Sequence, residues 1–155
     1  MTQECPGLVT FRCNYAPRLL DLAAGLERPK KAPPEIVMPT EVKAIHDQAV
    51  TGLMPAFDRS DFHHSKDWID RCAADLAQLW RFPEMWAVTD VQDGKSGRLL
   101  HIVAVAGKWS EAHLSRMEQW GKSMGCSAVY ATGRPGWARL IKNAKVKTIT
   151  VKKDL

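Results

Sequence analysis

Apolar residues recur at helical spacing in the first half of the chain. Thr40 is a predicted N-cap, and the apolar positions after it predict a helix that ends at Pro55. A second helix is predicted to begin at Ser65 and to end before Pro83. The inner positions expected from this spacing are Val42, Ile45, Ala49 and Leu53 in the first helix, and Trp68, Ile69, Cys72, Leu76 and Leu79 in the second.

The apolar pattern becomes strand-like after residue 84. The stretches "MWAVTDVQ" and "RLLHIVAVAG" predict two strands, and "DGKSG" between them predicts a turn. Residues 99–106 are apolar almost without interruption, which is typical of a strand that is covered on both faces. A hairpin inside a layered domain is therefore expected.

Helices and strands alternate in the last third of the chain. Ser110 is the predicted N-cap and Gly125 the predicted stop of a helix with Leu114, Met117, Trp120 and Met124 on its inner face. "SAVYATG" predicts a strand, residues 135–143 a short helix and "VKTITVKK" a last strand. The connection from residue 100 to residue 130 is long enough to make the two strands that it joins parallel. This order predicts an α/β (α+β) fold, a mixed sheet with helices on both faces.

The first residues have a different composition. Four prolines crowd the segment "RPKKAPPEIVMPT", and proline lacks the N–H group that a regular helix or a central strand needs. We therefore expect an extended N-terminal arm over residues 1–39 and one domain over residues 40–155.

Composition narrows the class of protein. The chain has 155 residues, of which 45% are hydrophobic and 25% charged, as in a soluble domain with one core. No apolar run approaches the roughly 20 residues that cross a bilayer, and the first residues do not have the pattern of a signal peptide. We expect no membrane association and a reducing cytoplasm. The cysteines are scattered without a C-x-x-C pair, which predicts free thiols and no metal site.

The positive charge is concentrated at the end of the chain. The net charge is +5, and residues 134–155 contain seven Lys or Arg and one acid. A basic terminus can meet nucleic acid, an acidic partner or an anionic cofactor, or it can be a solvated face.

The turn after the long apolar strand is the first candidate binding site. In an open α/β sheet, ligands bind where a strand's carboxyl end meets the next helix, and the N–H groups of that helix start can hold a phosphate. The stretch here is "VAGKWSEAH", in which Gly107 is the single glycine. Lys108 would attract an anion, whereas Glu111 would repel it. The alternative is that Glu111 satisfies the helix dipole and that Trp109 packs on the core.

Two other features do not predict a site. The letters GKS in "DGKSG" suggest a phosphate-binding loop, but the glycine that this motif requires is replaced by Thr89, and the segment joins two strands. His101 lies in a strand that is predicted to be buried, so we expect a core histidine whose ring is hydrogen-bonded. No Ser/His/Asp arrangement is evident from the order of the residues.

The stretches "AVTDVQDGKSGRLLHIVAVAGK" and "EQWGKSMGCSAVYATGRPGWARLIKNA" resemble the GNAT acyltransferase superfamily. "MGCSAVYATGRPGWARLIK" is similar to the small GNAT-like proteins of tailed bacteriophages, which share a Gly-Cys, strand, Gly-Arg-x-Gly-Trp run. The resemblance covers residues 40–155. It implies two N-terminal helices, a sheet splayed open between the strands near residues 102 and 129, and acetyl-CoA in the splay.

The chain departs from active members of that family at two places. They usually carry an Arg or Gln-x-x-Gly-x-Gly or Ala run that holds the pyrophosphate, where this chain has "AGKWSE". They often have a tyrosine in the last helix as general acid, where this chain has "RLIKNAKVK". If the chain is active, the resemblance implies Tyr130 as the catalytic residue and Val105, Ala106, Gly107, Lys108, Trp109, Ser110 and Arg134 as the cofactor-binding residues.

Two functional hypotheses follow from the resemblance and its departures. The leading one is a phage-encoded virion component without catalysis and without a cofactor, placed inside the particle or in the portal or head–tail region. It would be made in the host cytoplasm, and it would contact other virion proteins and, through the basic C-terminal region, DNA. The alternative is an acetyl-CoA-dependent N-acetyltransferase.

Overall fold

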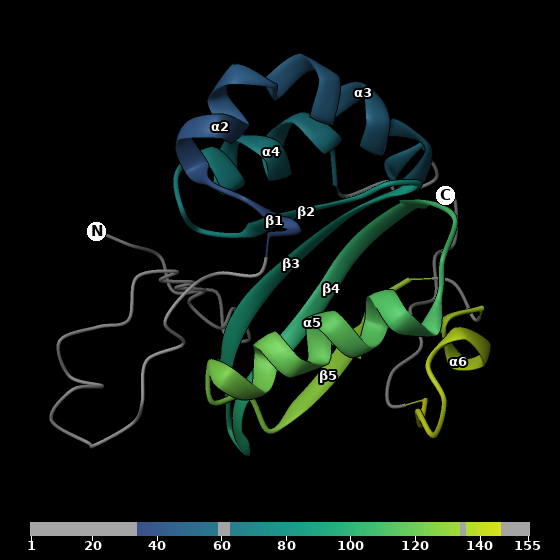
Figure 1. Cartoon of the computed structure of the whole chain (residues 1–155). Helices are drawn as coiled ribbons and strands as arrows, with labels where there is room; N and C mark the ends of the chain where they lie inside the picture. Colours follow the sequence, from purple (N-terminus) through teal and green to yellow (C-terminus); the bar gives the residue numbers. More distant parts are fainter. Residues whose placement is uncertain (1–33, 59–62, 134–135, 147–155) are drawn as a thin grey trace, which may run out of the picture.

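Among the residues that the structure describes, five strands form one mixed sheet in the order of the chain (Figure 1). The computed structural model describes residues 34–58, 63–133 and 136–146. Neighbouring strands are antiparallel except β4 and β5, which are parallel as predicted. The strands are β1 (Ile36–Val37), β2 (Gln78–Phe82), β3 (Met85–Gly94), β4 (Gly97–Gly107) and β5 (Ala128–Ala131).

Helices cover both faces of the sheet, which confirms the predicted fold class. The helices α2, α3 and α4 gather at one end of the sheet, and α5 crosses the opposite face (Figure 1). No helix in the described part of the chain is long and apolar enough to cross a membrane. The bounds are α2 (Pro39–Ala44), α3 (His46–Phe57), α4 (Ser65–Ala73), α5 (Glu111–Ser123) and α6 (Trp137–Leu140).

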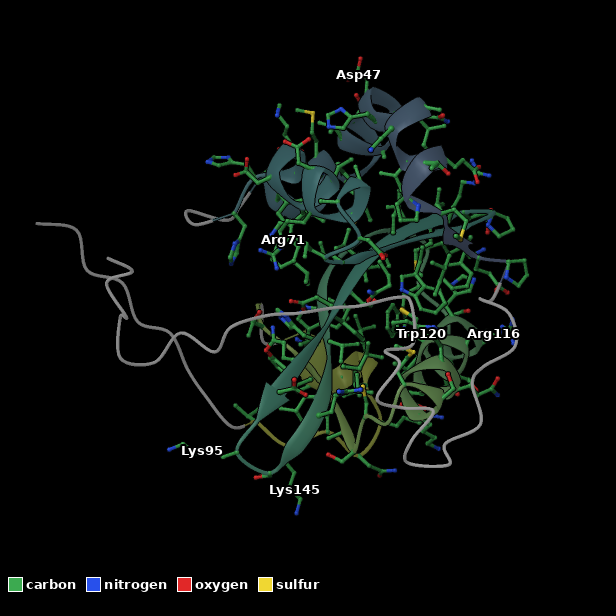
Figure 2. The ribbon with its side chains drawn as sticks, turned by 90° about the vertical axis from the view of Figure 1, so that its left-hand side faces the viewer. Asp47, Arg71, Lys95, Arg116, Trp120 and Lys145 are labelled. Atoms are coloured by element: carbon green, nitrogen blue, oxygen red, sulfur yellow. The ribbon has the colours of Figure 1, made fainter. Side chains whose placement is uncertain are left out.

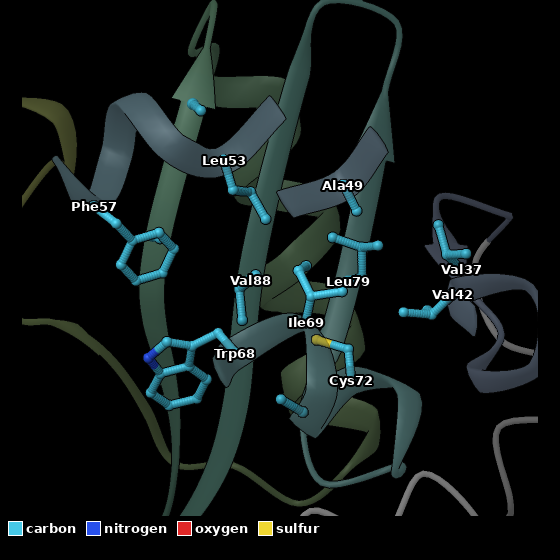
Figure 3. Packing of buried hydrophobic residues seen from close by; sticks show 13 residues of the cluster. Val37, Val42, Ala49, Leu53, Phe57, Trp68, Ile69, Cys72, Leu79 and Val88 are labelled. Atoms are coloured by element: carbon cyan, nitrogen blue, oxygen red, sulfur yellow. The ribbon is translucent and has the colours of Figure 1, made fainter. Parts of the chain in front are cut away.

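The first core layer lies between the sheet and the pair α3 and α4 (Figure 3). Leu53 of α3 and Ile69 of α4 are fully buried against Leu79 and Val88 of the sheet. Each fully buried side chain of this size stabilises the fold by about 2 kcal/mol. The packing of α3 and α4 on the sheet therefore stabilises both the helices and the sheet.

The second core layer lies under α5. Met117 and Trp120 of α5 pack on Leu100 and on Trp80, whose ring meets that of Trp120 edge to face at 5.7 Å. Figure 2 shows Trp120 turned from α5 toward the sheet. The indole N–H of Trp80 donates to Thr89 Oγ1 at 2.9 Å, so this buried polar atom is satisfied.

Local signals predicted α5 correctly. Ser110 is the N-cap, and its Oγ accepts a hydrogen bond from the His113 N–H at 3.3 Å. Gly125 follows the helix with φ of +79°, a conformation that favours glycine. The hairpin turn between β3 and β4 is also confirmed, and Lys95 lies at its tip, far from Asp47 at the helical end (Figure 2).

The first predicted helix is in fact two helices. The chain breaks at Ile45, and Pro39 occupies the first turn of α2, so Thr40 is not the N-cap. Pro55 lies inside the last turn of α3 and does not end it. A proline this close to a helix end removes one backbone hydrogen bond, and the burial of Leu53 and Phe57 offsets that loss.

The second predicted helix is too long. It ends at Ala73, and Leu79 lies in β2, where it pairs with Val37 on one side and Val88 on the other. Leu76 is exposed. Strand β2 was missed because its apolar residues continue the helical spacing of α4.

Two residues inside the proline-rich segment belong to the sheet. Ile36 and Val37 form the edge strand β1, a position that tolerates nearby prolines. The Glu35 carboxylate pairs with the Arg116 guanidinium of α5 at 3.1 Å, and Figure 2 shows Arg116 on that helix. The boundary at residue 39 stays a prediction, because most of the arm and the last predicted strand lie outside the described residues.

A histidine ties the start of α3 to α4. The His46 ring bonds Asp70 at 2.7 Å and Asp47 at 3.2 Å, and Asp70 also pairs with Lys66. The hydrogen bonds to Asp70 and then Asp47 raise the pKa of His46. A histidine whose pKa is raised on folding stabilises the protein fully below its unfolded value of about 6.5, and this stabilisation is lost as the pH rises through the folded value.

We predict that His46→Gln costs most stability in weak acid. The difference in free energy of unfolding between the wild type and the variant should be largest below about pH 6.5 and should shrink toward pH 8, since the ring is then neutral in both states. Urea unfolding at a series of pH values measures this difference. The same substitution at the exposed His64 is the control. A difference that does not change with pH would contradict the assignment.

Candidate functional site

The pairing of β4 with β5 stops halfway along β4. Their pairing ends at Ile102 and Ala131, but β4 continues to Gly107. Val103 has no partner in the register of β3, which marks a β-bulge at the same point. Within the described residues, no strand pairs with residues 103–107 on the β5 side. β4 therefore has an open edge beside residues 103–107 in this part of the chain, and we call this edge the splay.

The open edge of β4 presents backbone groups in a fixed pattern. The Lys108 N–H donates to the Glu84 carbonyl at 2.9 Å, so Lys108 is bonded toward β3. In an antiparallel ladder, bonded and non-bonded positions alternate. Gly107 and Val105 are therefore the non-bonded positions, and their N–H and C=O groups point away from β3 into the splay. An extended ligand with amide groups can pair with them as a strand would.

Glycine is required at position 107 because the turn between β2 and β3 passes close to it. Its φ is +110°, and a Cβ at this position would lie 2.2 Å from the Glu84 carbonyl oxygen. Only glycine has this conformation without strain and leaves room for that oxygen. The glycine thus serves the packing of β3 on β4, whatever else it does for a ligand.

The turn between β4 and α5 is occupied by side chains of the protein itself. The carboxylate of Glu111, in the first turn of α5, pairs with Lys142 Nζ at 2.6 Å. The Trp109 ring meets the Trp137 ring of α6 edge to face at 5.5 Å, and α6 lies beside the start of α5 (Figure 1). Lys108 pairs with Glu84 at 3.6 Å. A diphosphate at this helix start would have to displace an acid that already neutralises the helix dipole.

A row of polar side chains crosses the sheet where the strands part. Asp90 of β3, His101 of β4 and Tyr130 of β5 are register partners, so their side chains share one face. The Asp90 carboxylate is completely buried and accepts from His101 Nδ1 at 2.8 Å. The Tyr130 ring stacks on the His101 ring at 4.4 Å. The prediction that His101 is a buried, hydrogen-bonded histidine is confirmed.

Gln92 and Thr132 complete this polar row. The Gln92 amide nitrogen lies 3.3 Å from both Asp90 carboxylate oxygens, and the Tyr130 hydroxyl donates to the Gln92 carbonyl oxygen. His101 Nε2 lies 3.0 Å from Thr132 Oγ1. His101 Nδ1 lies 2.8 Å from Asp90 Oδ1 and 2.9 Å from the Gln92 amide nitrogen. Because a carboxylate only accepts, we assign the His101 proton to Nδ1 on the contact with Asp90, and Nε2 then accepts from the Thr132 hydroxyl. Thr132 is exposed, so the row ends at the surface.

Burial changes the acidity of two side chains in and beside the row. Burial, and then the charge of Asp90, raises the pKa of Tyr130 to about 12. A phenol this weakly acidic is a poor proton donor to a thiolate, whose usual pKa is near 8.5. The partial burial of its ring, and then the neighbouring His101, lowers the pKa of His63, which precedes α4.

The structure brings together only some of the residues that the sequence predicted. Six of these residues follow one another along the splay, namely Val105, Ala106, Gly107, Lys108, Trp109 and Ser110. The backbone N–H groups of Ala106 and Lys108, however, are directed toward β3. Arg134 lies outside the described residues. Tyr130 lies at the end of the splay with its hydroxyl bonded to Gln92. The roles assigned to these residues stay predictions.

Three residues of the polar row were missed. Asp90 could have been found, because the turn of Gly94 and Gly97 places residue 90 opposite residue 101, and an acid opposite a histidine in an apolar hairpin is a signal. Gln92 follows from the same alternation. Thr132 could not have been found, because its approach depends on the register of β5 against β4.

The polar row does not form a metal site. Asp90 and His101 are the acid and histidine in direct contact here. No group of three or more His, Cys, Asp or Glu that could hold a metal ion occurs among the residues that the structure describes.

Solved structures with a similar fold include aminoglycoside acetyltransferases. The chain superimposes with a TM-score of 0.56 on meta-AAC0020, from an uncultured soil metagenomic sample, in complex with trehalose, at 10% identity over 78% of this chain and 94% of that one. The same enzyme in complex with sisomicin gives a TM-score of 0.56 at 12% identity, also over 78% and 94% of the two chains. AAC(6')-Iy in complex with CoA gives a TM-score of 0.55 at 8% identity, over 77% and 92%.

No protein-family model matches the sequence. No curated protein matches it either. Identities this low establish the fold alone. The chain has a GNAT-like fold, the fold that the sequence resemblance implied.

We predict that Gly107 cannot be replaced without a large loss of stability. Gly107→Ala should lower the free energy of unfolding by about 3 kcal/mol, because it adds both a clash and a strained φ. Chemical denaturation measures the loss. Gly136→Ala, which adds the same methyl group in open space at a φ of −57°, should change the stability by less than about 0.5 kcal/mol. Equal effects at the two positions would contradict the packing described here.

Proposed function

We propose that this protein is an acyltransferase that takes an acyl group from a thioester such as acetyl-CoA and transfers it to an amine. The observation that carries the proposal is the open edge of β4, where the backbone amides of Val105 and Gly107 face the splay next to a buried Asp90–His101 pair. A thioester on a pantetheine arm supplies two amide groups in an extended chain, which is the chemistry that such an edge can pair with.

The buried acid and histidine also favour a reaction site. A carboxylate without any exposure costs free energy unless it is bonded on several sides, and an apolar residue would serve a scaffold better at this position. Here the carboxylate holds a histidine whose second nitrogen points toward the exposed Thr132. Such a histidine can take a proton from a reacting group at the end of the splay.

The residues fit the arm of acetyl-CoA better than its diphosphate. The edge of Val105 and Gly107 offers amide partners, whereas the start of α5 offers the Glu111–Lys142 pair and the Trp109 ring. We therefore propose that recognition rests on the acyl-pantetheine arm. The nucleotide end would contribute little to the affinity.

A second candidate is the non-catalytic role in a virion. The observation that favours it is the same occupied turn, because a protein that does not bind the coenzyme can fill this turn with its own side chains. The similarity of "MGCSAVYATGRPGWARLIK" to small proteins of tailed phages supports it as well. Mass spectrometry of purified particles tests this candidate, and absence of the chain from the particles would end it.

We predict that acetyl-CoA and acetyl-pantetheine bind with dissociation constants within about fivefold of each other, since the diphosphate adds little. Val105→Pro should weaken both at least tenfold, because it deletes an N–H that faces the splay and spares the ladder to β3. Isothermal titration calorimetry measures both constants. Val146→Pro, at an exposed residue outside the strands, is the control. If neither compound binds, the acyltransferase proposal is wrong and the virion role remains.

A further inference from the structure

We propose that Thr132 is a nucleophile that carries the acyl group covalently, with His101 as its base and Asp90 as the residue that positions the base. The inference rests on the proposed function only for the identity of the natural acyl donor. It goes further by placing a covalent intermediate on a named hydroxyl.

The three side chains have the geometry of an acid–base–nucleophile relay. Asp90 Oδ1 lies 2.8 Å from His101 Nδ1, and His101 Nε2 lies 3.0 Å from Thr132 Oγ1. The acid thus fixes one nitrogen of the ring, and the hydroxyl sits within hydrogen-bond reach of the other. These are the contacts that define such a relay on any fold, whatever the order of the residues in the chain.

Neighbouring groups hold the ring in place. The Gln92 amide nitrogen lies beside both oxygens of Asp90, and the Tyr130 hydroxyl anchors the other end of that amide. The Tyr130 ring lies almost parallel to the His101 ring, with an angle of 8° between their planes. The ring is therefore clamped from its edge and its face, with Nε2 directed at Thr132.

Burial falls in the order that a relay needs. Asp90 has no exposure, His101 is 8% exposed, and Thr132 is exposed. The acid is thus shielded from water, while the hydroxyl can be reached by a substrate. Thr132 also follows β5 directly, at the point where the splay opens beside Val103. A thioester lying along the open edge of β4 would bring its carbonyl carbon toward this hydroxyl.

The proposed reaction has two balanced steps. In the first, Thr132 Oγ1 bonds to the acyl carbon and the C–S bond breaks. His101 Nε2 takes the hydroxyl proton and gives it to the leaving thiolate. In the second, an amine or water attacks the ester carbonyl and loses a proton to His101, and the C–O bond to Thr132 breaks as its oxygen regains that proton. The free enzyme returns with no net change in charge.

A small activated ester tests this relay without the natural donor. We would incubate the full chain with p-nitrophenyl acetate, follow the release of p-nitrophenolate, and locate the acetyl group by peptide mass spectrometry. The expected result is a burst of p-nitrophenolate and an acetyl group on Thr132. Thr132→Val should abolish the label and lower the rate at least 100-fold, whereas Thr132→Ser should keep both.

Matched variants separate the relay from general surface reactivity. Thr51→Val, at an exposed threonine of α3, should react like the wild type. His101→Ala should lose the burst and regain part of it with added imidazole, which a purely structural histidine would not show. Asp90→Asn should lower the rate at least tenfold and move the midpoint of the pH–rate profile to lower pH. The ionisable groups that face the ring are Asp90, Tyr130 and His63.

The outcomes distinguish this inference from the proposed function. An acetyl group on other residues, with equal rates for the wild type and Thr132→Val, would overturn the relay even if acetyl-CoA binds. An acetyl group on Thr132 in a protein that binds neither acetyl-CoA nor acetyl-pantetheine would support the relay and overturn the proposed donor. Thermal unfolding of each variant shows whether a lost burst reflects a lost fold.

Discussion

The separation of β4 from β5 after residue 102 is the constraint on which the site depends. Up to that point the two strands satisfy each other's backbone groups. Beyond it, β4 remains bonded to β3 on one side, while Val105 and Gly107 present their amides to the other. Val105 is half-buried and Gly107 is exposed, so either water or a ligand can satisfy these amides. A ligand with amide groups would bind them through the main chain, which few side-chain substitutions can alter.

A buried carboxylate imposes the second constraint. Asp90 lies on the sheet face that α3 and α4 cover at the other end, and its charge is tolerable only because His101 and Gln92 bond it. Those bonds orient the imidazole, and the imidazole in turn reaches Thr132 at the point where the strands part. The splay and the polar row meet at one place, although they arise from different residues. The start of α5 is not open in this way, since Glu111 of α5 pairs there with Lys142, which follows α6.

The accuracy of the sequence predictions followed the range of the interactions involved. The start and end of α5 depend on Ser110 and Gly125, which act within one turn, so they could be read directly. Strand β2 depends on pairing with β1 and β3, and its spacing alone resembled a helix. The splay came from the family resemblance, and the superposition on acetyltransferases confirms the fold. Asp90 beside His101 was within reach of the hairpin register, whereas Thr132 required a crossover of about 30 residues to be placed in three dimensions.

Hydrogen exchange at single amides of β4 shows whether its edge is open. We predict that the Val105 and Gly107 amides exchange fast in the free protein, while the Ala106 amide between them, bonded to β3, exchanges slowly. Val105 and Gly107 should become protected when an acyl-pantetheine thioester is added. Equal protection of Val105, Ala106 and Gly107 in the free protein, unchanged by the thioester, would contradict an open binding edge.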